Sequence, residues 1–222
     1  MQRKNLEQIY KLLLERFGRQ GWWPGETRFE IIVGAVLTQN TNWKNVERAI
    51  ANLKEAGCMT PAGLKQLEIG ELAELIRPAG YYNIKAKRLK NFIGWLFDNY
   101  EGRLEHVEQS ATEQLRGRLL SINGIGRETA DSILLYAFGR AVFVIDAYTA
   151  RVAFRHNLAY PDSDYEMLQE LFASNLPNDA ELFNEYHALF VELGKRYCSR
   201  RKPKCTGCPL EHLPHTLEPE YY

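Results

Sequence analysis

The feature that most constrains the fold of this sequence is the spacing of its apolar residues, which repeat with the period of an α-helix. Two stripes at i, i+3, i+4, i+7 and i+8, over residues 29–37 and 130–138, show it most clearly. The only run that resembles a β-strand, residues 141–145, finds no second strand with which to pair. The spacing predicts an all-α fold in which residues 141–145 form a buried connector.

Residues that start and stop helices lie between these apolar stripes. Thr60 is followed by Pro61, which predicts an N-cap with proline at the first helical position. Asp162, Ser163 or Asp164 could cap a further helix in the same way. Glycine and proline fall between the stripes, and no low-complexity linker divides the chain. Any two domains must therefore be directly joined.

Composition places the chain among ordinary globular proteins. Of its 222 residues, 45% are hydrophobic and 25% are charged, which disfavours intrinsic disorder and coiled coil. The 28 basic and 28 acidic residues balance, but basic residues cluster over 85–90 and over 195–204. No apolar stretch approaches the ~18 residues of a spanning helix. The expected location is the cytoplasm, and no membrane partner is expected.

Three of the four cysteines lie close together near the end of the sequence. Cys198, Cys205 and Cys208 fall within eleven residues, whereas Cys58 stands alone. Even spacing typical of a disulfide-stabilised secreted domain is absent. The close thiols are better interpreted as metal ligands in a reducing compartment.

The segment around Gly124 predicts a tight turn between two helices. Gly124 and Gly126 flank Ile125, so the backbone can bend sharply and its amides can approach an anion. Such a turn suits a phosphate group in a nucleic-acid backbone. Further along the chain, Asp146 ends the buried connector and precedes a helical pattern, where the helix dipole favours an ionised carboxylate.

Five motifs in this order resemble the helix-hairpin-helix DNA glycosylases of the endonuclease III superfamily. They are LTQNT, GYYNIKAKRL, LLSINGIGRETA, VID and KRYCSRRKPKCTGCP. The resemblance spans nearly the whole chain and implies two helical lobes with a DNA cleft between them. It places a six-helix barrel at 23–138, with the hairpin at about 112–138. The second lobe would combine residues 1–22 with 139–222 and carry a cysteine loop at 198–214.

The resemblance also assigns roles in catalysis and DNA binding. Asp146 matches the catalytic aspartate of the family, and Glu128 stands where bifunctional members carry the lysine that forms a Schiff base. A glutamate cannot form an imine, so a monofunctional glycosylase that uses water is expected. The residues expected to contact DNA phosphates are Gly124, Ile125, Gly126, Arg127, Thr129, Arg200, Arg201 and Lys202.

Base flipping and base recognition are assigned through the same resemblance. Gln39 and Tyr81 match the two loops whose side chains fill the space left by a flipped base. The strings WWP, GAVLTQNT and GIGRETAD are similar to a 3-methyladenine glycosylase branch. Trp22, Trp23 and Pro24 would then line an aromatic pocket for a cationic methylated purine. Lys195 is a further candidate, since some members of that branch carry a modified lysine near the pocket.

The cysteines match the family's iron–sulfur pattern only in part. Three positions of C-x6-C-x2-C-x5-C are filled, but the fourth falls on Pro214, which cannot bind iron. His212 or His215 could replace it. A [4Fe-4S] cluster, a zinc site of three cysteines and one histidine, and no metal at all stay open.

Three functional alternatives stay open beside an alkylated-purine glycosylase. The chain could excise another lesion or a mismatched base, it could cleave the DNA strand through an amine elsewhere, or it could bind DNA without catalysis. In every case the expected partner is double-stranded DNA, bound by a monomer, and in the catalytic cases the DNA carries a damaged base. The sequence leaves the identity of the excised base undetermined.

Overall fold

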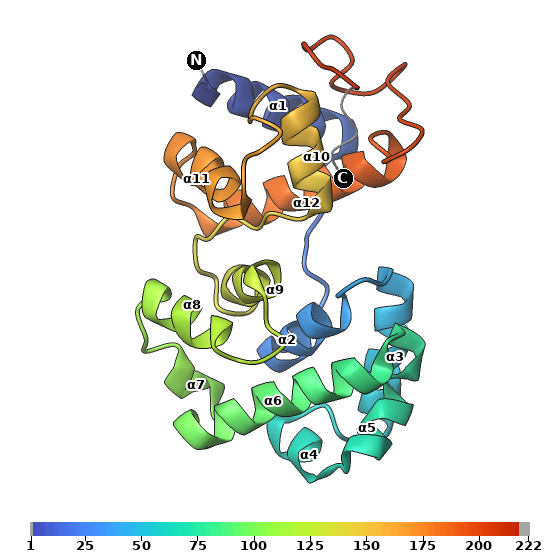
Figure 1. Ribbon diagram of the computed structural model, residues 1–222, viewed down its shortest axis with the longest axis vertical. Helices are drawn as coiled ribbons and strands as arrows, with labels where there is room; N and C mark the ends of the chain where they lie inside the picture. Colours follow the sequence, from blue (N-terminus) through green and yellow to red (C-terminus); the bar gives the residue numbers. More distant parts are fainter. Residues whose placement is uncertain (1, 218–222) are drawn as a thin grey trace. The chain divides into compact units, whose positions relative to one another are not determined.

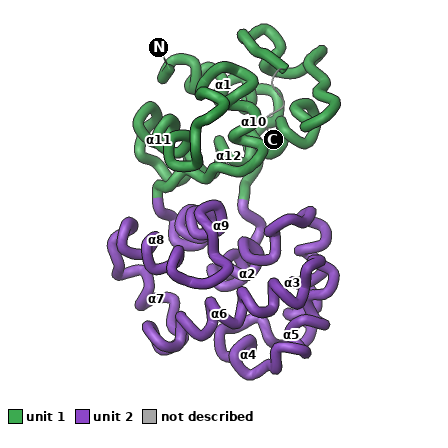
Figure 2. The backbone as a smooth tube through the Cα atoms, in the orientation of Figure 1, with its two compact units in different colours: residues 1–22, 141–222 green, residues 23–140 purple. Residues whose placement is uncertain are grey.

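A computed structural model describes residues 2–217, and within that range it is helical with no β-strand. The chain divides into two compact units, residues 1–22 with 141–222 (unit 1) and residues 23–140 (unit 2), coloured in Figure 2. The boundary follows Arg140, whose guanidinium donates to the carbonyl oxygens of Glu108 (2.6 Å) and Ser110 (3.3 Å) in unit 2. Among the described residues, no helix combines the length and apolar character needed to cross a bilayer.

Unit 1 joins the first helix of the chain to the last three. Its helices are α1 (Gln2–Phe17), α10 (Ala147–Arg155), α11 (Tyr165–Asn175) and α12 (Ala180–Arg196). The predicted connector has no regular secondary structure, and its Phe143 stacks on Phe172 with ring centroids 4.2 Å apart. Tyr186 donates to the carbonyl oxygen of Leu6 at 2.8 Å. Aromatic packing therefore fixes the connector that leads to Asp146.

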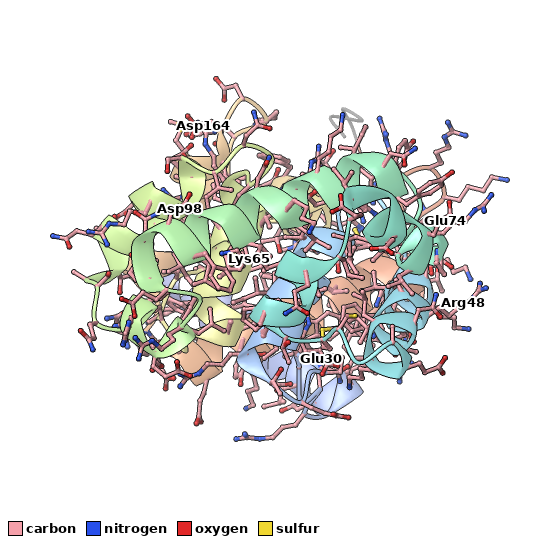
Figure 3. All side chains as sticks on the ribbon, turned by 90° about the horizontal axis from the view of Figure 1, so that it is seen from below. Glu30, Arg48, Lys65, Glu74, Asp98 and Asp164 are labelled. Atoms are coloured by element: carbon pink, nitrogen blue, oxygen red, sulfur yellow. The ribbon has the colours of Figure 1, made fainter. Side chains whose placement is uncertain are left out.

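Unit 2 is built around one long helix, α6 (Tyr82–Tyr100), shown in Figure 1. The others are α2 (Arg28–Leu37), α3 (Trp43–Glu55), α4 (Pro61–Gln66), α5 (Ile69–Leu75), the 3₁₀ turn η1 (Arg77–Ala79), α7 (Leu104–Val107), α8 (Thr112–Leu120), α9 (Arg127–Ser132) and the π-turn η2 (Ile133–Ala137). Helix α6 packs against α2, α4, α5, α7 and η1. Charged side chains labelled in Figure 3, such as Arg48, Glu74 and Asp98, are exposed.

Local sequence signals explain where several helices begin. Thr60 caps α4, with its hydroxyl accepting from the Gly63 amide and Pro61 at the first position. Of the three candidates before α11, Asp164 is the cap and accepts from the Met167 amide. The stripe at residues 130–138 differs from expectation, because it changes from α-helix to the wider π-turn after Ser132. All five residues of that turn are buried, so in the π-turn every side chain packs into the protein interior.

Candidate active site

Asp146 lies at the N-terminus of α10, where the buried connector ends. Its carboxylate accepts a hydrogen bond of 2.7 Å from the Thr149 amide, so it caps the helix. The side chain is 13% exposed, which leaves it mostly shielded from water but still reachable. The connector holds this position because Phe143 is stacked in the core and its carbonyl accepts from Gln169 at 2.7 Å.

Asp146 also faces a histidine that sequence reasoning did not select. His187 Nε2, on α12, lies 3.5 Å from Asp146 Oδ2, and the histidine is buried. Burial alone would raise the pKa of Asp146, but the charge of His187 and the hydrogen bond from the Thr149 amide lower it below its ordinary value. The carboxylate is therefore ionised at neutral pH. No motif marks His187, because α10 and α12 bring it to Asp146 only through tertiary packing.

A glycine sets how closely α10 approaches α12. Gly194 lies seven residues after His187, on the same face of α12. A Cβ at Gly194 would lie 2.1 Å from Cδ1 of Tyr148, which is in the first turn of α10. The missing side chain therefore makes room for the Tyr148 ring and lets Asp146 reach His187.

The predicted hairpin in unit 2 joins α8 to α9. Gly124 has φ +95°, a conformation that strongly favours glycine, and a Cβ there would lie 2.3 Å from the Arg88 side chain. Gly126 is the N-cap of α9 and is exposed. Because glycine has no side chain, no side chain at the N-cap covers the first-turn amides of α9. Arg116 on α8 binds both carboxylate oxygens of buried Asp131 on α9 at 2.7 and 3.0 Å. This ion pair, in which the Arg116 side chain is 17% exposed, ties together the two helices of the hairpin.

Gln39 is joined to this hairpin. Its amide nitrogen donates to the carbonyl oxygen of Gly124 (3.1 Å) and to the Thr129 hydroxyl (2.8 Å), and its amide oxygen accepts from Arg88. Tyr81 has the opposite surroundings, with 69% of its surface exposed and a left-handed backbone at φ 48°. Of the two residues expected to fill a flipped base's place, Tyr81 projects into solvent and Gln39 is held by the hairpin.

The other predicted DNA-contacting residues divide between the two units. In the hairpin, Ile125 is buried and Arg127 and Glu128 are exposed on the first turn of α9. In unit 1, the basic residues Arg200, Arg201 and Lys202 are exposed.

The two adjacent tryptophans fall on opposite sides of the unit boundary, which follows Trp22. In unit 1, the Lys195 ammonium lies over the Trp22 ring, 5.3 Å from its centroid. In unit 2, the Trp23 ring packs on Trp43 at 5.1 Å and on Tyr136 at 4.8 Å. Each tryptophan is half-buried in an aromatic or cationic environment of its own, and the following Pro24 is exposed.

Arginines of α10 hold the cysteine loop. Arg151 Nε donates to the carbonyl oxygen of Cys198 at 2.7 Å. One turn later, Arg155 donates to the Cys198 sulfur (3.2 Å) and to the carbonyl oxygens of Ser199 and Arg200 (both 2.9 Å). Helix α10, which Asp146 caps, therefore also holds the basic segment after Cys198 in place.

The three clustered cysteines line one hollow in unit 1 that is partly open to solvent. His215 lines it as well, whereas His212 does not. His215 Nδ1 lies 2.8 Å from the carbonyl oxygen of Leu213, which leaves Nε2 as the acceptor nitrogen. Within residues 2–217, no three such side chains converge closely enough for a single metal ion.

His156 also lines the hollow, with its ring centroid 5.6 Å from that of His215. Burial lowers the pKa of His156 to about 4, aided by the nearby His215. His156 is therefore neutral at neutral pH. Burial likewise raises the pKa of the Cys208 thiol, and the neighbouring Cys198 and Cys205 raise it further.

Comparison with known proteins identifies the family. Residues 33–178 match the HhH-GPD superfamily of base excision DNA repair proteins. The chain is 50% identical over 207 residues to the Methanocaldococcus jannaschii protein named "Putative DNA repair glycosylase MJ1434", covering 92% of this chain and 93% of the relative. It is 33% identical to endonuclease III of Sulfolobus acidocaldarius, covering 84% and 82%. The chain therefore belongs to the HhH-GPD superfamily, as its motifs predicted.

Solved structures agree with this assignment. The 3-methyladenine DNA glycosylase MagIII of H. pylori, bound to 1,N6-ethenoadenine, has a TM-score of 0.74 and 31% identity, covering 88% of this chain and 97% of MagIII. A non-covalent endonuclease III–DNA complex has a TM-score of 0.82 at 23% identity, covering 95% and 94%, which shows the fold alone. The predicted all-α helix-hairpin-helix fold is confirmed.

Proposed function

We propose that this DNA repair glycosylase is monofunctional and hydrolyses the N-glycosidic bond of an alkylated purine flipped out of double-stranded DNA. One observation carries the proposal: Asp146 is a shielded, ionised carboxylate, held by the Thr149 amide and by His187. Glu128 supports the monofunctional part, because it occupies the hairpin position of the Schiff-base lysine and has no amine.

The chemistry follows from the charge of Asp146. As the bond between the base and C1′ breaks, positive charge develops on the deoxyribose, and a nearby carboxylate stabilises it. Water then adds to C1′ and releases a proton, which Asp146 can accept. A purine already cationic through methylation leaves as a neutral base, so its departure needs no added proton. Because the site offers a carboxylate and the cationic base needs no proton from an acid, an alkylated purine is the favoured substrate.

Aromatic side chains support the same substrate class. A cationic base gains about 1–2 kcal/mol over a neutral one by lying on the face of an aromatic ring. The Lys195 ammonium lies 5.3 Å from the centroid of the Trp22 ring, which puts the two residues next to each other. MagIII, whose name gives 3-methyladenine as its substrate, is 31% identical to this chain. We therefore assign Trp22, Trp23, Pro24 and Lys195 to base recognition.

Among the residues expected to hold DNA, Ile125 and Thr129 are buried, so contact with phosphates would fall to the exposed groups of the hairpin and of the basic segment, which read no base sequence. The turn around Gly124 and Gly126 presents backbone amides at the start of α9, as phosphate binding requires. Arg200, Arg201 and Lys202 would contribute charge to phosphates. We assign insertion into the duplex primarily to Tyr81, which is exposed. Gln39 could insert only after breaking its hydrogen bonds to the hairpin. The protein would act as a monomer on chromosomal DNA in the cytoplasm.

We further propose that Cys198, Cys205, Cys208 and His215 hold a [4Fe-4S] cluster. Three free thiols and one imidazole line the same hollow, and His215 Nδ1 bonds a backbone carbonyl, as metal-binding histidines commonly do. When bound, the cluster would cross-link the basic loop to the end of α12. Its role would be structural, and catalysis rests on Asp146.

The cluster proposal is tested by iron and sulfide content and by the visible absorption of anaerobically purified protein. His215→Ala should lose iron, whereas His212→Ala, a matched change outside the hollow, should retain it. Stoichiometric zinc in the wild type, or equal iron in both variants, would contradict the assignment.

The substrate proposal is tested with duplexes that contain methylated, deaminated, oxidised or mismatched bases. Release of methylated purines alone, without strand cleavage or a borohydride-trapped adduct, is the expected result. A trapped adduct would mean that another amine acts as a lyase. Excision of a different lesion would reject the alkylated purine, and binding without excision of any base would favour a non-catalytic role.

Recognition by the tryptophans has its own test. Trp23→Ala should lower excision of 3-methyladenine far more than it lowers affinity for an abasic-site analogue. Because losing a core aromatic side chain costs ~3–5 kcal/mol of stability, both activities must be compared at a temperature where the variant is folded. An equal loss of excision and of affinity would mean that Trp23 has a structural role and does not recognise the base.

A further inference from the structure

A single buried ammonium group joins the roots of two loops in unit 2. Lys85, on α6, is 1% exposed. Its Nζ donates to the carbonyl oxygen of Leu37 (2.9 Å) and to that of Ala79 (2.8 Å). Leu37 is the last residue of α2, and Ala79 is the last of η1. Carbonyl oxygens at helix ends lack partners within the helix, so one cation satisfies two separate helix ends.

The segments that follow these two ends carry Gln39 and Tyr81. Leu37 leads directly into Thr38 and Gln39, and Ala79 leads through Gly80 into Tyr81. Both segments contain left-handed backbone, at Asn40 (φ 54°) and at Tyr81 (φ 48°). Non-glycine residues persist in that conformation only when their surroundings hold them there. The Lys85 contacts are placed to supply that support to both segments at once.

Keeping a charge at this position is costly, which indicates that the contacts matter. Burial, together with the positive charge of Arg88, lowers the pKa of Lys85 to about 8. The group is still mostly protonated at neutral pH.

We propose that Lys85 is a positioning residue for base flipping, fixing the Gln39 segment relative to Tyr81 so that both meet the duplex together. The inference rests on the proposed function, because it takes Tyr81 as the side chain that fills the space opposite an orphaned base. Lys85 contacts neither DNA nor the reacting atoms. It acts through the two carbonyl oxygens that it binds.

The same helix offers a matched control in Lys90. Its Nζ donates to the carbonyl oxygens of Leu64 (2.8 Å), Lys65 (3.1 Å) and Leu67, at the end of α4. Lys90 therefore also caps a helix end with an ammonium group, but it holds neither the Gln39 segment nor Tyr81. Lys85→Met and Lys90→Met remove the same kind of contact on α6 and differ in which segments they release.

The experiment uses a duplex with 2-aminopurine opposite a tetrahydrofuran abasic-site analogue, so that no excisable base is needed. Stacking of Tyr81 on the orphaned 2-aminopurine changes its fluorescence, while anisotropy of the same duplex reports binding. Lys85→Met should lower the equilibrium constant for insertion of Tyr81 into the duplex about tenfold relative to Lys90→Met. Tyr81 would still be present, but it would no longer be held in the orientation that insertion requires. Anisotropy should change little in either variant.

Hydrogen exchange without DNA gives a second readout. Amides of residues 38–41 and 80–83 should exchange faster in Lys85→Met than in wild type, and should be unchanged in Lys90→Met. Equal insertion and equal exchange in the two variants would overturn the inference. No fluorescence change with wild-type protein would instead reject Tyr81 insertion and the proposed function. If Lys85→Met does not fold, Lys85→Gln, which is shorter and uncharged, takes its place in the same comparison.

Discussion

Gly194→Ala should disable Asp146 without touching it. The new Cβ would lie 2.1 Å from Tyr148 Cδ1, whereas ordinary contact begins at 3.4 Å, so the two must separate by 1.3 Å. Crowding of this kind costs about 1–3 kcal/mol, offset by roughly 1 kcal/mol because alanine favours helix over glycine. Moving α10 away from α12 also draws Asp146 from His187. Misplacement by about 1 Å can cost 100-fold in rate, and we expect a loss of that order in excision.

The assay is single-turnover excision of the best substrate in the duplex panel, measured well below the melting temperature of each variant. Gly94→Ala is the control, because Gly94 lies inside α6 and a Cβ there meets no atom within 4 Å. That variant should gain about 0.5–1 kcal/mol of stability and excise at the wild-type rate. Wild-type excision by folded Gly194→Ala would refute the idea that this glycine sets the position of Asp146.

Three further predictions concern other parts of the molecule. Asp131→Asn removes the charge that pairs with partly exposed Arg116 and should lower the free energy of unfolding by about 1–3 kcal/mol, measured by denaturant titration, and an unchanged free energy of unfolding would contradict it. The folded pKa of Asp146 lies below its unfolded value, so its stabilisation is present above the unfolded pKa and is lost as pH falls through the folded pKa. His187→Gln should move that loss of stability, and the acid limb of the excision rate, to higher pH. Unchanged pH profiles of stability and excision would mean that His187 does not affect the titration of Asp146. Tyr81→Gly relieves a left-handed backbone and should stabilise the fold by about 1 kcal/mol while reducing insertion into DNA, so reduced stability would contradict the strain.

Local signals in the sequence were enough to predict the elements that carry most of the candidate site. Thr60 with Pro61 marks a helix start, and the apolar run before Asp146 marks a connector, because both depend on neighbouring residues only. The hairpin was predictable for the same reason, since Gly124 and Gly126 provide the backbone freedom that the turn requires.

What the sequence could not provide are partnerships created by packing between distant segments. His187 meets Asp146 only because α12 presents Gly194 to the Tyr148 ring of α10. Such a contact depends on the distance between two helices, which no periodicity records. The same holds for Lys85, which the sequence places only in a basic cluster, whereas the structure buries it against the carbonyl oxygens of Leu37 and Ala79.

Choosing between His212 and His215 also needed the structure. The two histidines are close in sequence, and either could have replaced the missing cysteine at Pro214. Only the path of the chain after Cys208 brings His215 to the hollow and leaves His212 outside it.

The measurement that tests the account most directly is the excision rate of Asp146→Asn, compared with its affinity for DNA that contains an abasic-site analogue. Asparagine keeps an oxygen that can accept from the Thr149 amide, so the cap of α10 and the fold should persist. Only the negative charge is removed. Excision should therefore be abolished while affinity is largely retained. Excision within about threefold of wild type, less than the 10²-fold expected for a lost electrostatic group, would contradict the catalytic role of Asp146.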